Sequence, residues 1–268
     1  MQYDTAKLII GTAFFVVAGF ELASGCFLFR KLSSKKDVIL DVAGTFIVPA
    51  LVLPSVLLLS SQTCSFILPN HSGAWSDLPW WAMIGILLLA DDLTQYLWHR
   101  LSHTSWLYPL HRAHHSAHYL SVRVVYRNNL IYYALMPGLW LSGILVYLGF
   151  MAVYPSYVVV KMLVIMGAHS SVPWDRKLLQ WPATKPLMWV LSRVISTPTT
   201  HAAHHGLHES DDATHYRGNY GNLLFLWDVI FGTAKITGKR PSTFGIEGLI
   251  PVPWYRELLW PVRARKDS

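Results

Sequence analysis

The histidines of this chain are concentrated in one part of the sequence and recur at spacings that metal sites use. Of the 13 histidines, all but His71 lie between His99 and His215. They form the boxes His99-x3-His103, His111-x2-His114-His115 and His201-x2-His204-His205, with His169 standing alone before the last box. Residues three and four apart share one face of a helix, so each box directs two or three imidazoles to one place. Neutral imidazole is the commonest protein ligand of iron, zinc and copper, and three such boxes are enough to surround two metal ions.

Two ordinary explanations of the histidines compete with a metal centre. A single histidine in an apolar stretch is usually a hydrogen-bonded core residue, so one HxxxH alone is weak evidence. Two HxxHH boxes together with an HxxxH rarely arise by chance. A histidine-rich low-complexity tract is excluded because the boxes are dispersed and separated by apolar segments.

The composition is that of a membrane protein. Of the 268 residues, 53% are hydrophobic and only 14% are charged, whereas an ordinary soluble domain carries about 25% charged residues. The net charge of +7 is gathered at the ends of apolar runs, which suits an anionic membrane surface and excludes a nucleic-acid footprint. Cys26 lies inside an apolar run and Cys64 outside one, so we expect neither a disulfide nor sulfur ligation of a metal.

Five apolar stretches predict membrane helices, and they cover about residues 8–29, 38–60, 79–98, 130–150 and 151–168. Pro49 and Pro54 predict kinks in the second helix, and Pro137 predicts one in the fourth. The start of the chain lacks the layout of a cleaved signal peptide, so the first stretch is expected to remain as a membrane helix.

The fourth and fifth stretches form a closely spaced hairpin with Lys161 near the middle of its second arm. A charge in the middle of a bilayer costs a few kcal/mol unless it snorkels or pairs. Three spans and a hairpin that only dips into the bilayer are therefore the alternative to five spans. The predicted fold is an all-α polytopic membrane protein with about four or five membrane helices. A cytosolic helical cap holds the histidine-rich dimetal site, and residues 1–268 form one domain.

Lysines and arginines predict the orientation. They follow the first, third and fifth stretches: Arg30, Lys31, Lys35 and Lys36; Arg100, Arg112, Arg123 and Arg127; Arg176, Lys177, Lys185, Arg263, Arg265 and Lys266. Cytoplasmic loops carry the excess of basic residues. The N-terminus and loop 61–78 are therefore expected outside, and the histidine boxes are expected to face the cytoplasm.

Two acids interrupt the third apolar stretch. Asp91 and Asp92 stand there, and Asp92, Gln95, Tyr96, His99 and His103 share one helical face. A carboxylate on that face could orient a metal-binding imidazole. Because Asp92 is about 10 Å along the axis from His99, it would have to serve a histidine of another box. The alternative is that the helix has left the bilayer there and these polar side chains are simply exposed to water.

Several blocks of sequence follow a family pattern. They are Asp92-x3-Tyr96-x2-His99-Arg100-x2-His103, His111-Arg112-Ala113-His114-His115-Ser116, Gly167-Ala168-His169-Ser170, Thr197-Pro198-Thr199-Thr200-His201-x2-His204-His205-Gly206, Asn219-Tyr220-Gly221-Asn222 and Trp227-Asp228-x2-Phe231-Gly232-Thr233. These blocks resemble the fatty acid hydroxylase and sterol desaturase superfamily of integral-membrane di-iron enzymes. The resemblance covers about residues 80–235, with a catalytic histidine region over about 91–235. Its last part looks most like the alkylglycerol monooxygenase-like branch.

The resemblance implies a four-helix membrane core under a cytosolic bundle, with two iron ions per chain held by histidines alone. The implied ligands are His99, His103, His111, His114, His115, His169, His201, His204 and His205, with His208 as a tenth ligand or a water contact. Several relatives carry a second histidine beside the His169 box, where this chain has Ile165 and Ser170, which leaves the coordination of one metal open. Asp92, Tyr96 and Asn219 are candidates for outer residues of the centre, although Asn219 also fits turn chemistry.

Iron held by uncharged imidazoles is suited to attack on an unactivated C–H bond with O2 as co-substrate, a reaction that zinc does not support. The expected activity is that of an iron-dependent oxidoreductase that hydroxylates or desaturates the aliphatic part of a membrane lipid. The sequence shows no donor domain, so a separate reductase with a ferredoxin or cytochrome is expected.

The alternative is a non-redox membrane protein that binds zinc for structure or transport. Structural zinc needs only four ligands, and transport would spread ligands over several spans.

Overall fold

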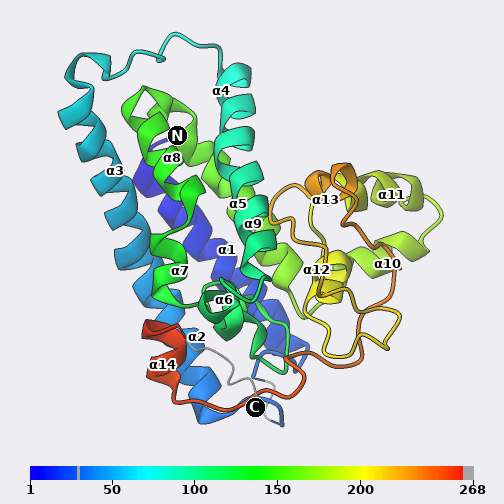
Figure 1. Cartoon of the computed structure of the whole chain (residues 1–268). Helices are drawn as coiled ribbons and strands as arrows, with labels where there is room; N and C mark the ends of the chain where they lie inside the picture. The colour runs from blue at the N-terminus through cyan, green and yellow to red at the C-terminus, as the bar shows by residue number, and fades with distance from the viewer. Residues whose placement is uncertain (29–30, 262–268) are drawn as a thin grey trace.

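The computed structural model describes residues 1–28 and 31–261, so the predictions for Phe29, Arg30, Arg263, Arg265 and Lys266 lie outside the described residues. Long helices run side by side, and the short helices between residues 174 and 230 gather beside them (Figure 1). The regular elements in the described part of the chain are helices. Two isolated β-bridges, Ile195 with Leu224 and Gly206 with Phe244, occur beside them. The predicted all-α class is confirmed.

Two helices are long and apolar enough to cross a membrane. The first is α1 (Tyr3–Ala23), and the second runs from Lys35 to Ile67 as α2 (Lys35–Ile47), a π-helical turn η1 (Val48–Val52) and α3 (Leu53–Ile67). Pro49 lies in the π-helical turn and Pro54 is the second residue of α3, and the helix from Lys35 to Ile67 is continuous through both prolines. A bent pair, α9 (Tyr154–His169) and α10 (Trp174–Gln180), passes the same test as one unit broken at an angle of 80°.

Lipid-facing side chains explain the apolar composition. Phe15 of α1, Phe46 of α2 and Phe66 of α3 are 73%, 67% and 88% exposed. An exposed apolar surface of that kind is stable only against another apolar medium, here the hydrocarbon of a bilayer. The protein is therefore a membrane protein, and its number of crossings beyond these helices remains a prediction.

A third long helix carries the first histidine box. It consists of α4 (Trp80–Leu87), a second π-helical turn η3 (Leu88–Leu93) and α5 (Thr94–Ser102), and it contains the stretch expected at 79–98. Asp91 and Asp92 are both buried in η3. Lys161 of α9 donates to Asp91 Oδ2 at 2.6 Å, so the charge expected to be costly in the bilayer is paired.

The predicted hairpin is present, but its first arm is not one helix. The chain forms α7 (Leu130–Ala134), α8 (Pro137–Tyr147) and then α9. Pro137 begins α8 instead of kinking a longer helix, and Gly149 ends the arm with φ of +118°, a conformation that favours glycine. The 11 residues of α8 span about 17 Å, less than the roughly 30 Å of a bilayer core. The prediction of a helix over 130–150 was therefore wrong.

Short elements complete the chain. They are η2 (Pro69–His71), α6 (Tyr108–His115), η4 (Val122–Val124), η5 (Phe150–Ala152), α11 (Lys185–Val194), α12 (Pro198–His204), α13 (Leu226–Ile230) and α14 (Trp254–Leu259). Packing joins α3 to α8, α1 to α9, and α9 to α12. Through the last of these contacts the membrane helices and the short helices share one site.

Buried ion pairs fasten the short helix α6 to the long helix α2. The side chain of Arg127 is 1% exposed, and it binds Asp37 at 2.7 Å and Asp41 at 3.0 Å. The Nε of Arg127 also donates to the carbonyl of Ala113 in α6 at 2.9 Å. Breaking a buried pair by removing one partner typically costs about 3–5 kcal/mol, so this connection fixes the position of the second histidine box.

Candidate metal centre

Nine buried or half-buried histidines form two adjacent groups. Within each group the potential ligand atoms all lie within 4.8 Å of one another. The five-histidine group contains His99, His103, His111, His115 and His204, and the four-histidine group contains His114, His169, His201 and His205. The structure thus brings together all nine histidines that the resemblance implied as ligands.

Helical spacing divides the second and third boxes between the groups. In α6, His111 and His115 are one turn apart and face the five-histidine group, while His114 faces the other. In α12, His204 faces the five-histidine group, and His201 and His205 face the four-histidine group. Each HxxHH box therefore serves both groups at once.

The remaining histidines of the two groups come from the C-terminal ends of long helices. His99 lies in the last turn of α5, and His103 caps that helix. His169 is the last residue of α9. Helix α12 begins with a capping box in which the Thr197 hydroxyl accepts from Thr200 N, and such a cap fixes where the helix starts. The cap of α12 and the ends of α5 and α9 together determine which imidazoles lie next to one another.

Backbone carbonyls orient four of the imidazoles by accepting from Nδ1. His99 donates to Tyr220 O at 2.7 Å and His204 to Gly218 O at 2.8 Å. His169 donates to Ile165 O at 2.8 Å and His114 to Arg127 O at 3.2 Å. A proton held at Nδ1 leaves the lone pair on Nε2, which is the tautomer that a metal ligand needs.

The Nε2 atoms left free by this arrangement fit a metal. Those of His99, His103 and His204 are buried and have no hydrogen-bond partner among the described residues. In the four-histidine group, Nε2 of His201 lies 3.0 Å from Nε2 of His169 and 3.1 Å from Nε2 of His205. Imidazole lone pairs facing one another in a buried site are unfavourable unless a proton or a cation lies between them. The donor set is all nitrogen, which suits iron, zinc or copper.

Burial keeps these imidazoles neutral. Removal from water, followed by the proximity of the other histidines, holds the pKa of His111, His115 and His204 well below the usual value, and the same is true of His114, His201 and His205. Only the neutral form offers a lone pair to a metal. The site is therefore in its ligating form at neutral pH.

Asp92 has a different role from the one expected. Its carboxylate accepts from Trp227 Nε1 at 2.8 Å and from the amides of Leu223 and Leu224 at 3.3 and 3.1 Å, and within the described part of the chain it forms no hydrogen bond with an imidazole. The expectation that Asp92 orients a histidine is corrected accordingly. A buried carboxylate needs such donors to offset its desolvation, and here they tie the 223–227 segment to η3.

Tyr96 and Asn219 also act at a distance from the imidazole nitrogens. Tyr96 hydrogen-bonds to the Thr233 hydroxyl at 2.9 Å and stacks on Phe231 with 5.4 Å between centroids. Asn219 has φ of +57°, a conformation that asparagine tolerates. Its side chain donates to Thr200 O and accepts from Lys235 N. Asn219 thereby holds the turn whose neighbouring carbonyls bind His204 and His99.

Asp228 was not singled out as a site residue, although it belongs to the Trp227-Asp228 pair. Its carboxylate accepts from the amides of Tyr220 at 2.9 Å and Gly221 at 2.6 Å, and from the Thr233 hydroxyl at 2.6 Å. The Tyr220 peptide therefore connects a carboxylate on one side to His99 on the other. An acid next to a tryptophan gives no sequence signal for a role that passes through the backbone.

The other histidines lie apart from the two groups. His208 is exposed and lies 3.5 Å from Glu247, so the structure does not bring the suggested tenth ligand to the centre. His118 is exposed and its Nδ1 lies 3.2 Å from Phe244 O, while His215 is half-buried. The set that converges is the nine-histidine set.

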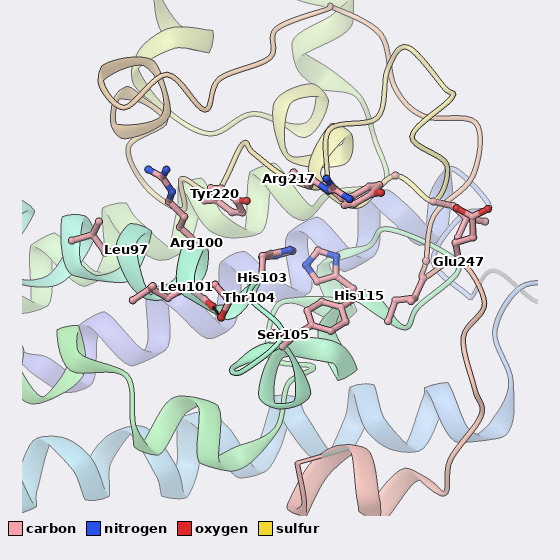
Figure 2. Close-up of a pocket in the computed structure, with 16 residues that line it drawn as sticks. Leu97, Arg100, Leu101, His103, Thr104, Ser105, His115, Arg217, Tyr220 and Glu247 are labelled. Carbon is pink, nitrogen blue, oxygen red and sulfur yellow. Dashed lines mark hydrogen bonds between the residues drawn. The ribbon is translucent and has the colours of Figure 1, made fainter. Parts of the chain in front are cut away.

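Two cavities reach the histidines. An outer cavity of about 900 Å³ is bordered by His103, His115, Arg100, Arg217 and Glu247. Figure 2 shows His103 and His115 next to each other at its centre, between Arg100 and Glu247. An inner cavity of about 150 Å³ lies among the long helices and reaches both groups through His99, His111, His114 and His169. Its other lining residues are mostly aromatic and aliphatic.

Residues 84–233 match the family model described as fatty acid hydroxylase. The chain belongs to the fatty acid hydroxylase family. No solved structure matches it. The matched segment contains all nine histidines of the two groups and the turn that orients them, which is the part of the chain where the resemblance was found.

Membership of the fatty acid hydroxylase family makes this protein an oxidoreductase of lipids. The family uses iron, and the nine imidazoles are able to bind metal. The position of the groups at the C-terminal ends of α5 and α9 places that chemistry at the end of the apolar helices, where an aliphatic chain leaving the bilayer can reach it.

Proposed function

We propose that this protein uses a di-iron centre and O2 to hydroxylate an aliphatic carbon of a membrane lipid, with desaturation as the closely related alternative. The observation that carries the proposal is the pair of histidine groups at the end of an apolar cavity among membrane helices. Nine nitrogen ligands exceed the four that a structural zinc site needs. Their confinement to one end of the helices also disfavours transport, which needs polar groups along a path.

The reaction balances with an external supply of electrons. In hydroxylation, a C–H bond and O2 with two electrons and two protons give C–OH and one water. In desaturation, two C–H bonds are lost, and the same electrons and protons reduce both oxygen atoms to water. Iron held at the two groups supplies the redox chemistry with O2, which zinc cannot supply. We propose a separate reductase with a ferredoxin or cytochrome as the electron donor.

The protein's own residues position the lipid and exclude water. The inner cavity offers apolar walls for an aliphatic chain, among them Leu57, Val158 and Ile165. Burying such a chain contributes about 0.8 kcal/mol for each CH2. The hydrogen bonds from His99 and His204 to backbone carbonyls hold the imidazoles in place, so that the lipid carbon meets a fixed site.

The outer cavity gives the same histidines a polar approach. Arg100 and Arg217 border it, and positive charge at an opening favours encounter with an acidic donor protein. We propose that the lipid uses the inner cavity and that electrons arrive on the side of the outer one. With the basic residues Lys31, Lys35 and Lys36 near the same end of the helices, this side is proposed to face the cytoplasm.

The decisive test supplies iron-loaded protein with a matched reductase, a lipid extract and 18O-labelled O2. Label in a lipid supports hydroxylation, and a loss of two hydrogens without label supports desaturation. A zinc content by itself decides nothing, because many sites bind Zn(II) more tightly than Fe(II). If iron-loaded protein with a working reductase consumes no O2 with any class of lipid, the proposal is wrong.

A further inference from the structure

The inner cavity contains three polar side chains that the proposed chemistry does not use. Asp91 and Lys161 form an ion pair of 2.6 Å with side chains 5% and 10% exposed, and Gln95 follows Asp91 by one helical turn. All three line the cavity, whose wall is otherwise aliphatic or aromatic until the histidines and Asn128 and Asn222 are reached. We propose that Asp91, Gln95 and Lys161 bind the hydroxyl group of a neutral lipid. The inference rests on the proposed function in taking that lipid as the substrate.

Two helices set the same distance from this polar group to the histidines. One face of α9 lines the cavity through Tyr154, Val158, Lys161, Ile165 and His169. The facing helix lines it through Asp91, Gln95 and His99. Lys161 precedes His169 by eight residues, and Asp91 precedes His99 by eight. At about 1.5 Å per residue the separation is roughly 12 Å on both sides.

Unused hydrogen-bonding capacity matches a hydroxyl. An ammonium has three donors, and among the described residues Lys161 Nζ makes one hydrogen bond, to Asp91. The Oε1 atom of Gln95 is buried and has no donor among them. A hydroxyl group both accepts and donates, so it can accept from Lys161 and donate to Gln95.

Charge excludes an anionic head group. Lys161 is the only lysine or arginine among the residues that line the inner cavity, and Asp91 already neutralises it. A carboxylate or phosphate would therefore enter without a counter-charge, which is costly in a medium of low dielectric constant. A neutral alcohol carries no such cost. The ligand class is a long-chain alcohol or a sterol, which share this hydroxyl chemistry.

Such a site would determine which carbon of the substrate is oxidised by its distance from the hydroxyl group. With the hydroxyl held at Lys161 and Gln95, the carbon that reaches the histidines is fixed by the distance of roughly 12 Å along the helices. A longer chain then extends beyond the histidines and is attacked at the same position counted from the hydroxyl. Without the site, only chain length and shape would decide the position.

The binding experiment uses the purified full chain in detergent and measures dissociation constants for ligands of matched length. A primary alcohol is compared with the alkane and the fatty acid, and a sterol is compared with its hydroxyl-free analogue. We expect both hydroxyl ligands, or one of them, to bind more tightly than their partners, which tells the two sources apart. One neutral hydrogen bond is worth about 2–10-fold in affinity, so Gln95→Leu should weaken alcohol binding by that factor and leave alkane binding unchanged.

Matched variants separate a binding role from a folding role. Gln62 is exposed on α3, so Gln62→Leu makes the same change on the bilayer surface and should leave the alcohol preference intact. The double variant Asp91→Leu with Lys161→Met removes both charges together, because an unpaired buried charge would destabilise the protein. It should reduce the preference for alcohol over alkane, and adding Gln95→Leu to it should abolish that preference. The inference is overturned if neither the alcohol nor the sterol binds the unchanged protein more tightly than its hydroxyl-free partner, or if the fatty acid binds more tightly than the alcohol.

Product analysis keeps this inference distinct from the proposed function. Alcohols of increasing length should be oxidised at a constant position from the hydroxyl, and a position constant from the methyl end contradicts the site. Alcohol-selective binding without oxidation of any lipid removes the proposed function and leaves the hydroxyl site. Oxidation of a lipid without any preference for alcohols removes the hydroxyl site and leaves the proposed function.

Discussion

The carbonyl oxygen of Tyr220 lies 2.7 Å from Nδ1 of His99. The amide N–H of Gly221, which belongs to the same peptide unit as that carbonyl, donates to Asp228 at 2.6 Å, so one peptide unit transmits the position of a carboxylate to an imidazole. Groups that orient a metal-bound histidine in this way typically change metal affinity or activity about 10–100-fold when they are lost.

Asp228→Asn should therefore lower metal affinity by about 10–100-fold. The amide side chain keeps the size of the carboxylate but cannot accept from Tyr220, Gly221 and Thr233 as a charged group does. Competition with a chelator of known affinity gives the measurement. Asp212 is exposed in the same part of the chain, and Asp212→Asn is the matched control. Equal metal affinity of the two variants would show that the Tyr220 peptide is held by other contacts.

Single alanine substitutions should divide the histidines into two classes. His201→Ala and His204→Ala each remove a ligand, and their loss of activity should exceed the 10–100-fold expected for an orienting partner. His208→Ala should leave both metal content and activity near those of the unchanged protein, because His208 is exposed and lies beside Glu247. Metal analysis and O2 consumption are measured on the same preparations. Normal turnover by His204→Ala would sink the assignment.

Gly218→Ala should disturb the centre through the backbone. A Cβ atom at this position would lie 2.3 Å from Thr233 O and 2.2 Å from His215 Nε2, and the Gly218 carbonyl accepts from His204. We expect a loss of roughly 1–3 kcal/mol in stability, typical of overpacking, together with weaker metal binding. Gly19→Ala in α1 meets nothing within 4 Å and should be neutral or slightly stabilising. Thermal unfolding of both variants checks the prediction, and a stable Gly218→Ala protein with full metal content would contradict it.

Removal of metal should lower the melting temperature. Nine imidazoles packed without a cation leave buried lone pairs facing one another, whereas a bound ligand at 100 times its dissociation constant adds about 2.7 kcal/mol to the folded state. Unfolding is followed before chelation, after chelation and after metal is returned. An unchanged melting temperature through this cycle would mean that the groups bind no metal.

Site-directed labelling tests the proposed orientation. His71 lies in the exposed loop after α3 and Asp212 in the exposed part of the short-helix region. Cysteine introduced at position 71 should react from outside the cell and cysteine at position 212 only from the cytoplasm. Native Cys64 is buried and is a poor reporter, so both native cysteines are first replaced by serine. Labelling of position 71 from the cytoplasm would reverse the orientation.

Sequence patterns predicted which histidines come together in the structure, because a metal site imposes spacing on its ligands. His111, His114 and His115 must be three and four apart to face two groups from one short helix, and that spacing is visible in the letters. His169 could be found only through the resemblance, since a lone histidine carries no spacing. The apolar runs predicted α1 and the helix from Lys35 to Ile67 for the same physical reason, the length of a bilayer.

Contacts made through backbone were beyond a sequence-based prediction. The hydrogen-bond partners of His99 and His204 are the backbone carbonyls of Tyr220 and Gly218. Because every residue has a carbonyl, the residue types at these positions do not predict the contacts. Asp92 was misjudged because a carboxylate beside a histidine box can bind either an imidazole or an amide, and tertiary packing brought the amides of Leu223 and Leu224. The sequence predicted a kink at Pro137, whereas α8 begins at that residue, because proline in the first turn of a helix and proline within a helix look alike in sequence.

The division of each HxxHH box between the two groups has a consequence for how metal enters. Helix α6 contributes His111 and His115 to one group and His114 to the other, and α12 is shared in the same manner. An ion in either group would order both helices and so prepare the ligands of its neighbour. Two ions held there would therefore bind with positive cooperativity, and by reciprocity the loss of one would loosen the other. Half-loaded molecules should be scarce in a titration, with empty and fully loaded protein in direct exchange.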